Sequence, residues 1–159
     1  MSGSNLDCLM KIVERSGLPF VLHEHTPTRT MEDAMHLPFD LARIVKTVAF
    51  RTRNNGLVRA VLRAASRVDY PRLAALVGVN RRDLFPLSPE EVREFLGVEP
   101  GSVSPVPQRD DVAVFIDDDV LTILPTIYCG IGRSDRTMEM TPDDLVKLTS
   151  GQLGGFSRK

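Results

Sequence analysis

The spacing of apolar residues near the N-terminus is typical of an amphipathic helix. Leu6, Leu9 and Val13 recur at intervals of three and four residues, which places them on one helical face. Gly17 follows this run and can adopt the backbone conformation that often ends a helix. The pattern therefore predicts a helix over residues 5–16.

Farther along the chain, apolar runs alternate with turn and helix-start signals. The turn signal Asn54-Asn55-Gly56 separates two such runs, so residues 45–52 and 57–64 are predicted to form a hairpin. Other strands are predicted over residues 18–25, 112–116, 121–129 and 137–140. Capping residues predict further helices that begin near Thr28 or Thr30, Asp69, Ser88 and Thr141.

Predicted helices and strands are interspersed, with no repeat or linker between them. A chain of 159 residues can bury a core of its own without disulfides or metals. We therefore expect residues 1–159 to form one domain with a mixed sheet. The glycine-rich segment 151–159 is expected to be a flexible tail.

One residue interrupts a strand that is predicted to be buried. The segment Leu41–Phe50 reads as a buried strand, yet Lys46 lies in the middle of it. A lysine is rarely buried unless an anion accepts its charge, so Lys46 is expected to lie in a cleft or to meet an anion. The alternative is a lysine on an edge strand that points into water.

Charge is distributed unevenly along a chain whose net charge is −1. Residues 43–82 contain ten Lys or Arg and one acidic residue, Asp69, which gives this segment a charge of +9. Such a surplus favours a phosphate-rich partner. The alternative is that these arginines only protect strand edges and keep the surface soluble.

Composition and cysteine spacing limit the classes of protein further. A hydrophobic content of 42% and a charged content of 26% are ordinary for a globular domain. Cys8 and Cys129 form neither a metal-ligand spacing nor a disulfide framework, which fits a reducing compartment. We find no signal-peptide pattern and no apolar run of about 18 residues, so we expect a cytoplasmic protein without a membrane partner.

The common catalytic motifs are absent from the sequence. It contains no P-loop, dinucleotide fingerprint, zinc spacing or nucleophile elbow. His23 and His25 share a strand face but lack a third ligand, and the acidic run at residues 117–119 is expected to be a solvated turn. Cys129 is expected to be a small buried residue rather than a nucleophile. We therefore expect no metal and no cofactor.

Two glycine loops are more informative. Residues 97–105 and 130–135 are rich in glycine, which lets the backbone approach a ligand closely and leaves N–H groups free to face an anion or a carbonyl. Together with Lys46, these loops would form a cleft of backbone donors and one cation.

These features together resemble those of the YbaK/prolyl-tRNA-synthetase-associated editing domain family. The similar segments occur in the family's order: residues 25–30, the lysine strand Arg43-Ile44-Val45-Lys46-Thr47, the helix at 87–92, the loop Gly97 to Gly101-Ser102-Val103-Ser104-Pro105, and residues 132–145. The resemblance implies an α+β fold with a twisted, mixed, mostly antiparallel sheet or partial barrel flanked by helices. It covers residues 5–150, nearly the whole chain.

The resemblance also implies an activity, a free-standing trans-editing hydrolase that deacylates mischarged aminoacyl-tRNA, often tRNA(Pro) carrying a small amino acid. The implied catalytic residues are Lys46, which binds the terminal phosphate or ribose or polarises the carbonyl, and Gly101, whose backbone lies beside the ester. The implied substrate-binding residues are Thr47, Ser102, Ser104, Pro105, Gly130, Tyr128, His25 and Thr30. The implied partners are the acceptor end of a mischarged tRNA and prolyl-tRNA synthetase or another synthetase, but not DNA.

The sequence does not choose the amino acid that is removed. Members specific for alanine carry Asn after the lysine and a later His-Pro pair, whereas this chain has Thr47 and Leu124-Pro125. The branch that includes Cys-tRNA(Pro) deacylases has the Lys-Thr pair, yet its usual Ser-Ala-Gly ending is reduced here to Gly130. A non-catalytic module that binds tRNA or a synthetase and a small-molecule hydrolase are the alternative functions.

Overall fold

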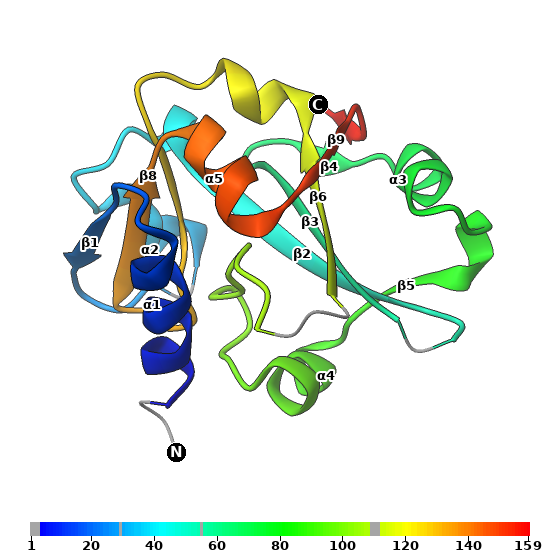
Figure 1. The fold of residues 1–159 in the computed structure, drawn as a ribbon, viewed down its shortest axis with the longest axis horizontal. Coiled ribbons are helices and arrows are strands. Elements are labelled where there is room, and N and C mark those ends of the chain that lie inside the picture. The colour runs from blue at the N-terminus through cyan, green and yellow to red at the C-terminus, as the bar shows by residue number, and fades with distance from the viewer. Residues whose placement is uncertain (1–3, 29, 55, 109–111) are drawn as a thin grey trace.

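A long strand, β2 (Val45–Thr52), crosses the middle of the molecule (Figure 1). The computed structural model describes residues 4–28, 30–54, 56–108 and 112–159. The other strands are β1 (Val21–Glu24), β3 (Leu57–Arg63), β4 (Arg67–Val68), β5 (Leu84–Pro86), β6 (Val112–Asp117), β7 (Ile127–Gly130), β8 (Arg136–Met140), β9 (Gln152–Gly154) and β10 (Ser157–Arg158).

The helices are short and most begin at a capping residue. They are α1 (Ser4–Ser16), α2 (Met31–Met35), α3 (Tyr70–Val77), α4 (Pro89–Glu91) and α5 (Pro142–Thr149), with the 3₁₀ turns η1 (Leu41–Arg43), η2 (Arg81–Asp83) and η4 (Asp118–Thr122) and the π-helical turn η3 (Val92–Leu96). Asp69, Ser88 and Thr141 accept hydrogen bonds from the first turns of α3, α4 and α5, which confirms these three predicted starts.

The largest sheet has the strand order β5-β2-β3-β6-β9. The antiparallel pairing of β2 with β3 confirms the hairpin that the sequence predicts. β3 pairs with β6, and β6 with β9, in parallel. A second, antiparallel sheet has the order β1-β8-β7, and it meets the first through a bridge between Ile44 and Tyr128. The fold is therefore α+β with a mixed, mostly antiparallel sheet, and the described strands do not close into a barrel.

Alternation along β2 directs its side chains to two different layers. Val45 joins a core formed with α1, α5 and the smaller sheet, whereas Phe50 joins a core formed with α3. Lys46 lies an even number of residues from Phe50, so it shares the face of β2 that is turned toward α3. Figure 1 shows α1 beside the smaller sheet and α3 at the opposite end of the molecule.

The C-terminal segment is not the tail that the sequence predicts. β9 pairs with β6 and β10 pairs with β4, and the Phe156 side chain between them is fully buried. Asp117, itself buried, holds this segment by accepting hydrogen bonds from the backbone N–H groups of Phe156 (2.8 Å) and Ser157 (3.0 Å) and from the Ser157 hydroxyl (2.7 Å). The expectation of a flexible tail is therefore wrong, because one buried aromatic ring and one carboxylate fix it.

The strand predicted over residues 121–129 is shorter than expected. Its first part forms the 3₁₀ turn η4, in which Val120 is buried, and the strand β7 begins only at Ile127. Asp117 caps this turn by accepting a hydrogen bond from the Asp119 N–H. Of the apolar residues that suggested an extended segment, Ile123 is buried directly after this turn, whereas Leu124 is 79% exposed.

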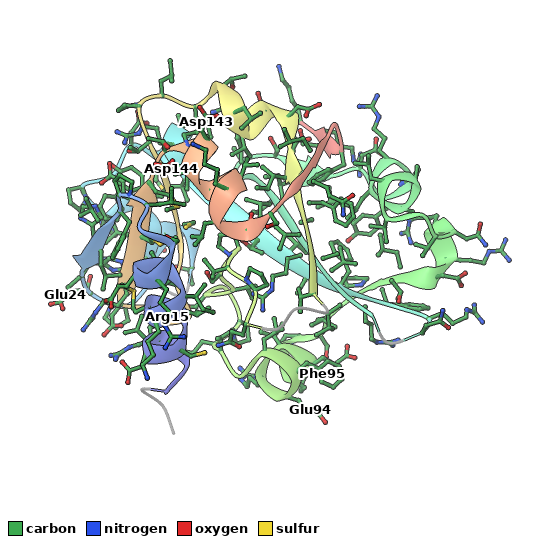
Figure 2. All side chains as sticks on the ribbon, viewed as in Figure 1. Arg15, Glu24, Glu94, Phe95, Asp143 and Asp144 are labelled. Atoms are coloured by element: carbon green, nitrogen blue, oxygen red, sulfur yellow. The ribbon has the colours of Figure 1, made fainter. Side chains whose placement is uncertain are left out.

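Four labelled acidic side chains mark parts of the molecule other than α3. Figure 2 shows Glu24 beside β1, Glu94 below α4, and Asp143 and Asp144 at the start of α5. None of these labelled acidic residues lies over α3. At the α3 end, Asp69 caps α3 and Asp83 lies in η2, each beside an arginine.

Candidate functional site

A cavity of about 490 Å³ opens where the beginning of β2 meets several other segments. Among them are residues 101–103, the end of β7 with the loop after it, the beginning of β8, and Thr30 and Phe39 from the segment before β2. The two glycine loops and the lysine strand, which are far apart in the sequence, therefore lie around one cavity. This is the cleft that the sequence predicts.

Lys46 is the basic residue of this cavity whose charge no carboxylate of the described chain neutralises. Arg133 and Arg136, which also line the cavity, both pair with Asp135, at 2.9 and 3.0 Å. Lys46 is half-buried and forms no ion pair with the described residues. Burial, and then the positive charge of Arg67, lower the pKa of Lys46. An anion bound beside Lys46 would offset both effects.

Gly101 brings a free backbone donor to the cavity. Its φ angle of +87° lies in the left-handed region that favours glycine. The Ser102 N–H donates to the Glu99 carbonyl at 3.0 Å, whereas the Gly101 N–H has no acceptor among the described residues. The loop can therefore present one N–H group to a ligand in the cavity.

A buried arginine supports this loop from behind. Arg59 on β3 is only 4% exposed, and its Nη1 donates to the Ser104 carbonyl at 2.6 Å. The Ser104 hydroxyl in turn accepts a hydrogen bond from the Val106 N–H at 3.1 Å. A charged donor held inside the protein gives a strong hydrogen bond, which fixes the position of the loop.

Gly130 lets β7 approach the loop backbone closely. A Cβ atom at this position would lie 2.9 Å from the Val103 carbonyl oxygen and 3.2 Å from the Ser102 carbonyl oxygen. On the other side, the Gly132 N–H donates to the Ser102 carbonyl at 3.0 Å. The wall of the cavity at this point is therefore made of packed backbone, and only glycine fits at residue 130.

An aromatic pair forms another wall of the cavity. Phe39 and Tyr128 stack with their ring centroids 4.4 Å apart, and the Arg43 guanidinium lies 4.7 Å from the centre of the Tyr128 ring. Glu139 anchors this arrangement by pairing with Arg43 at 3.2 Å and with His23 at 2.7 Å. A hydrogen bond from Thr126, followed by those from His23 and the charge of Arg43, lowers the pKa of Glu139.

Most of the residues that the sequence analysis named line the cavity. They are Lys46, Thr47, Gly101, Ser102, Tyr128, Gly130 and Thr30. The Thr30 hydroxyl is engaged in capping α2, since it accepts from the Asp33 N–H at 3.1 Å. The Thr47 hydroxyl is buried and has no hydrogen-bond partner among the described residues.

Three of the named residues lie behind the cavity wall. Ser104 and Pro105 are buried in the supporting part of the loop. His25 bonds through Nε2 to the Thr137 hydroxyl at 2.7 Å and packs edge-on against Phe39. The structure thus places these residues as supports of groups that line the cavity rather than as lining groups themselves.

Phe39 is a lining residue that sequence reasoning missed. It lies in an irregular segment between α2 and η1, where no periodic pattern marks it. Arg133 and Arg136 were also missed, although Arg133 belongs to the second glycine loop and Arg136 follows directly after it. Their pairing with Asp135 could not be seen from the sequence, since it depends on the turn before β8.

Cys129 lies in the cavity wall and is expected to be chemically inert. It is buried, and burial raises the pKa of its thiol to about 12, so the thiolate that nucleophilic chemistry requires is scarce near neutral pH. In native protein at pH 8 we expect iodoacetamide to modify the exposed Cys8 and to leave Cys129 unmodified, as mass spectrometry of peptides would show. Rapid labelling of Cys129 would contradict its assignment as a small buried residue.

Within the ranges that the structure describes, no three His, Cys, Asp or Glu side chains form a group that could hold a metal ion. The described helices are all too short or too polar to cross a bilayer.

Comparison with known proteins supplies the family. The model of the aminoacyl-tRNA editing domain matches residues 25–148, a range that includes Lys46, Gly101 and Gly130. The chain belongs to the aminoacyl-tRNA editing domain family. This editing-domain protein is 29% identical over 129 residues to the uncharacterized protein YwhH of Bacillus subtilis, and the match covers 80% of both chains.

The same editing domain is also similar to part of a larger enzyme. It is 38% identical over 100 residues to the proline–tRNA ligase of Xanthomonas axonopodis pv. citri, a match that covers 62% of this chain and 17% of the ligase. A second Xanthomonas ligase, from Xanthomonas campestris pv. campestris strain 8004, is 35% identical over 97 residues. The editing domain thus spans about one sixth of each ligase.

Solved structures share nearly the whole fold. The hypothetical protein APE2540 matches 95% of the editing domain with a TM-score of 0.85 and 25% sequence identity. A structure described as a proposed trans-editing enzyme for prolyl-tRNA synthetase matches 98% of both chains with a TM-score of 0.83 and 25% identity. The family resemblance seen in the sequence is therefore confirmed, and so is the fold class.

Proposed function

We propose that this editing-domain protein hydrolyses mischarged aminoacyl-tRNA in trans, with tRNA(Pro) carrying a small amino acid as its substrate. The observation that carries the proposal is one cavity lined by both Lys46, which forms no ion pair with the described residues, and Gly101, whose N–H has no acceptor among them. Membership of the editing-domain family supports the reaction class. The similarity to proline–tRNA ligases and to a proposed trans-editing enzyme supports the choice of tRNA.

The chemistry that we propose requires no side-chain nucleophile. An aminoacyl ester is already activated, so water held next to the carbonyl carbon can attack it directly. The water oxygen bonds to that carbon, the bond from the carbon to the ribose oxygen breaks, and the products are the free amino acid and tRNA. The Gly101 N–H stabilises the oxyanion formed in this step, and Lys46 binds the terminal phosphate or polarises the carbonyl.

The shape of the cavity supports a small amino acid. Phe39 and Tyr128 stack across one wall, and packed backbone at Gly130 forms another. Neither wall can retreat easily, because Tyr128 is held by Arg43 and the backbone by the close packing of Gly130. Thr47, Ser102 and Thr30 contribute to the remaining lining, with His25, Ser104 and Pro105 as supports.

A panel of mischarged tRNAs tests this proposal. Purified protein would be mixed with tRNA(Pro) charged with radiolabelled alanine, cysteine, serine or proline, and the loss of acid-precipitable label would be followed over time. We expect deacylation of at least one small wrong amino acid and sparing of Pro-tRNA(Pro). If every charged tRNA binds but none loses its amino acid, the protein is a non-catalytic tRNA-binding module and the proposal is wrong.

A further inference from the structure

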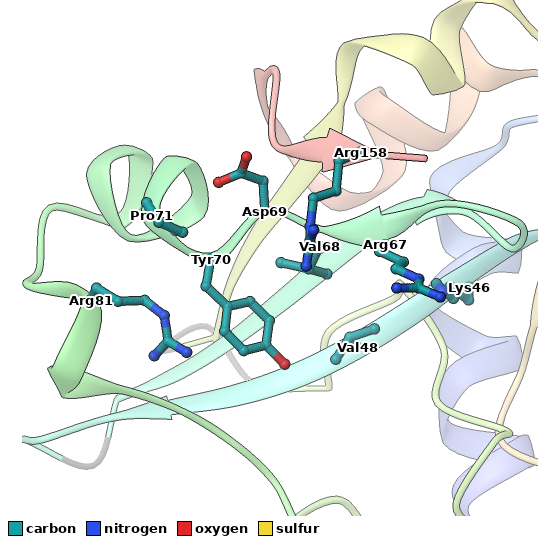
Figure 3. A pocket seen from close by; sticks show the side chains of 9 residues that line it. All are labelled: Lys46, Val48, Arg67, Val68, Asp69, Tyr70, Pro71, Arg81 and Arg158. Carbon is teal, nitrogen blue, oxygen red and sulfur yellow. The ribbon is translucent and has the colours of Figure 1, made fainter.

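A second hollow lies on the opposite side of Lys46 from the cavity. It has a volume of about 700 Å³ and lies between β2, β4, the start of α3 and the strand β10 (Figure 3). Lys46 and Val48 line both this groove and the cavity. A ligand seated in the cavity can therefore continue past Lys46 into the groove.

Positive charge dominates the groove. The groove is lined by one acidic residue, Asp69, and by four basic residues, Lys46, Arg67, Arg81 and Arg158. The Asp69 carboxylate accepts a hydrogen bond from the Arg72 N–H at the start of α3 and lies 3.8 Å from the Arg72 side chain, outside the groove lining. Its charge is thus largely used at the helix start.

Two of the groove arginines have no carboxylate partner. Arg67 and Arg158 are exposed, and neither forms an ion pair with any residue in the described ranges. Arg81 stacks over the Tyr70 ring, with its guanidinium carbon 4.3 Å from the ring centre. Figure 3 shows the nitrogen ends of Arg67 and Lys46 close together and Arg158 above Val68. Like charges gathered in one groove repel one another, and an anion bound between them would offset that repulsion.

The C-terminal strand completes the groove. In the pairing of β10 with β4, Arg158 lies opposite Arg67. The neighbouring Ser157 is held in place because its N–H and hydroxyl groups donate to the Asp117 carboxylate. The Asp69 N–H also donates to the Phe156 carbonyl, at 2.6 Å. Arg158 lies beyond residue 148, where the match to the editing-domain family ends, so the family model does not account for it.

We infer that this groove binds successive phosphates of the 3′-terminal strand of the tRNA, with Lys46 at the junction between the ester cavity and the phosphate groove. The inference rests on the proposed function for the identity of the RNA. The phosphates of an RNA strand are spaced along its length, and the basic side chains are likewise spaced along the groove. The cavity alone would hold only the terminal nucleotide. Arg158 is thus a binding residue that the C-terminal strand adds to the domain.

Two pairs of adjacent basic residues each provide a test variant and a matched control. Arg158 and Arg81 line the groove, whereas the adjacent Lys159 and Arg82 carry the same charge and do not line it. All four are exposed, so alanine substitutions should leave the thermal unfolding temperature unchanged. The matched controls remove an equal charge from the same region and correct for general electrostatic attraction.

Fluorescence anisotropy with uncharged tRNA(Pro) transcript tests the inference at several salt concentrations. Arg158→Ala and Arg67→Ala should each weaken binding about three- to tenfold and should lower the slope of log Kd against log salt by about 0.7, the contribution of one phosphate contact on a single strand. Arg81→Ala should weaken binding in the same direction. Lys159→Ala and Arg82→Ala should change Kd by less than about twofold.

A transcript that lacks its last three nucleotides locates the contact. Wild type should bind it more weakly than the intact transcript, and the effect of Arg158→Ala should fall below about twofold. Groove variants that bind intact tRNA like wild type would overturn the inference, and so would an Arg158→Ala effect that is undiminished on the trimmed transcript. Because uncharged tRNA is used, the outcome is independent of hydrolysis. If the protein deacylates tRNA but the groove variants bind it like wild type, only the inference about the groove is wrong. If the protein does not deacylate tRNA but the groove variants bind it more weakly, only the proposed hydrolase activity is wrong.

Discussion

Replacing Lys46 with alanine is expected to reduce deacylation by at least about a hundredfold while leaving the fold intact. The side chain is half-buried without a carboxylate partner in the described chain, and it lies where the cavity and the groove meet. Burial and the charge of Arg67 disfavour its charged form, so its removal should not lower the free energy of unfolding. Initial rates of label release and thermal unfolding measure the two effects separately.

Two further variants define what the Lys46 result means. Lys46→Gln keeps most of the side-chain length without the charge and should be as inactive as the alanine variant. Lys147→Ala removes an exposed lysine from α5 that does not line the cavity, and this variant should behave like wild type. Turnover by Lys46→Ala within a few fold of wild type would remove this residue from the mechanism.

Gly130→Ala is expected to damage both activity and stability. The added Cβ would lie 2.9 Å from the Val103 carbonyl oxygen, which belongs to the backbone, so the 102–103 segment must move. Overpacking of this kind costs about 1–3 kcal/mol of unfolding free energy. Because the Gly101 donor lies on the same loop, the deacylation rate should fall about a hundredfold. Chemical denaturation and initial rates would measure the losses.

Gly155→Ala is the matched control for this substitution. Its Cβ would have the Asp118 carboxylate oxygen as its nearest neighbour, at 3.8 Å, which is an ordinary contact. We expect this variant to differ from wild type by less than about 0.5 kcal/mol in stability and to be fully active. If Gly130→Ala were as stable and as active as Gly155→Ala, residues 102–103 could move to accommodate the added Cβ without loss, and the prediction would be wrong.

The sequence contained the local signals for most elements and for the centre of the site. Capping residues such as Ser88 and the turn at residues 54–56 predicted helix starts and a hairpin, because those signals act within a few residues. Lys46 stood out because a charge inside an apolar strand needs a physical reason. The two glycine loops stood out for their backbone freedom, and the cavity brings all three features together.

Features that depend on long-range contacts escaped prediction. β9 and β10 are only three and two residues long, too short for any periodic pattern, and they are fixed by Phe156 and by the distant Asp117. The groove could not be foreseen, since Arg158 joins the basic middle segment only through its pairing with β4. Phe39 escaped for the same reason, because its partner Tyr128 is remote in sequence.

The backbone wall around Gly130 has a consequence for how specificity can evolve. Main-chain groups at residues 101–103 keep their positions whatever side chains they carry, and a larger residue at position 130 is barred. In the proposed deacylase, variation in the size of the accepted amino acid would therefore fall on the side chains of the aromatic wall, Phe39 and Tyr128. Substitutions at these two positions would change the substrate that is accepted while leaving the backbone groups proposed for catalysis unchanged.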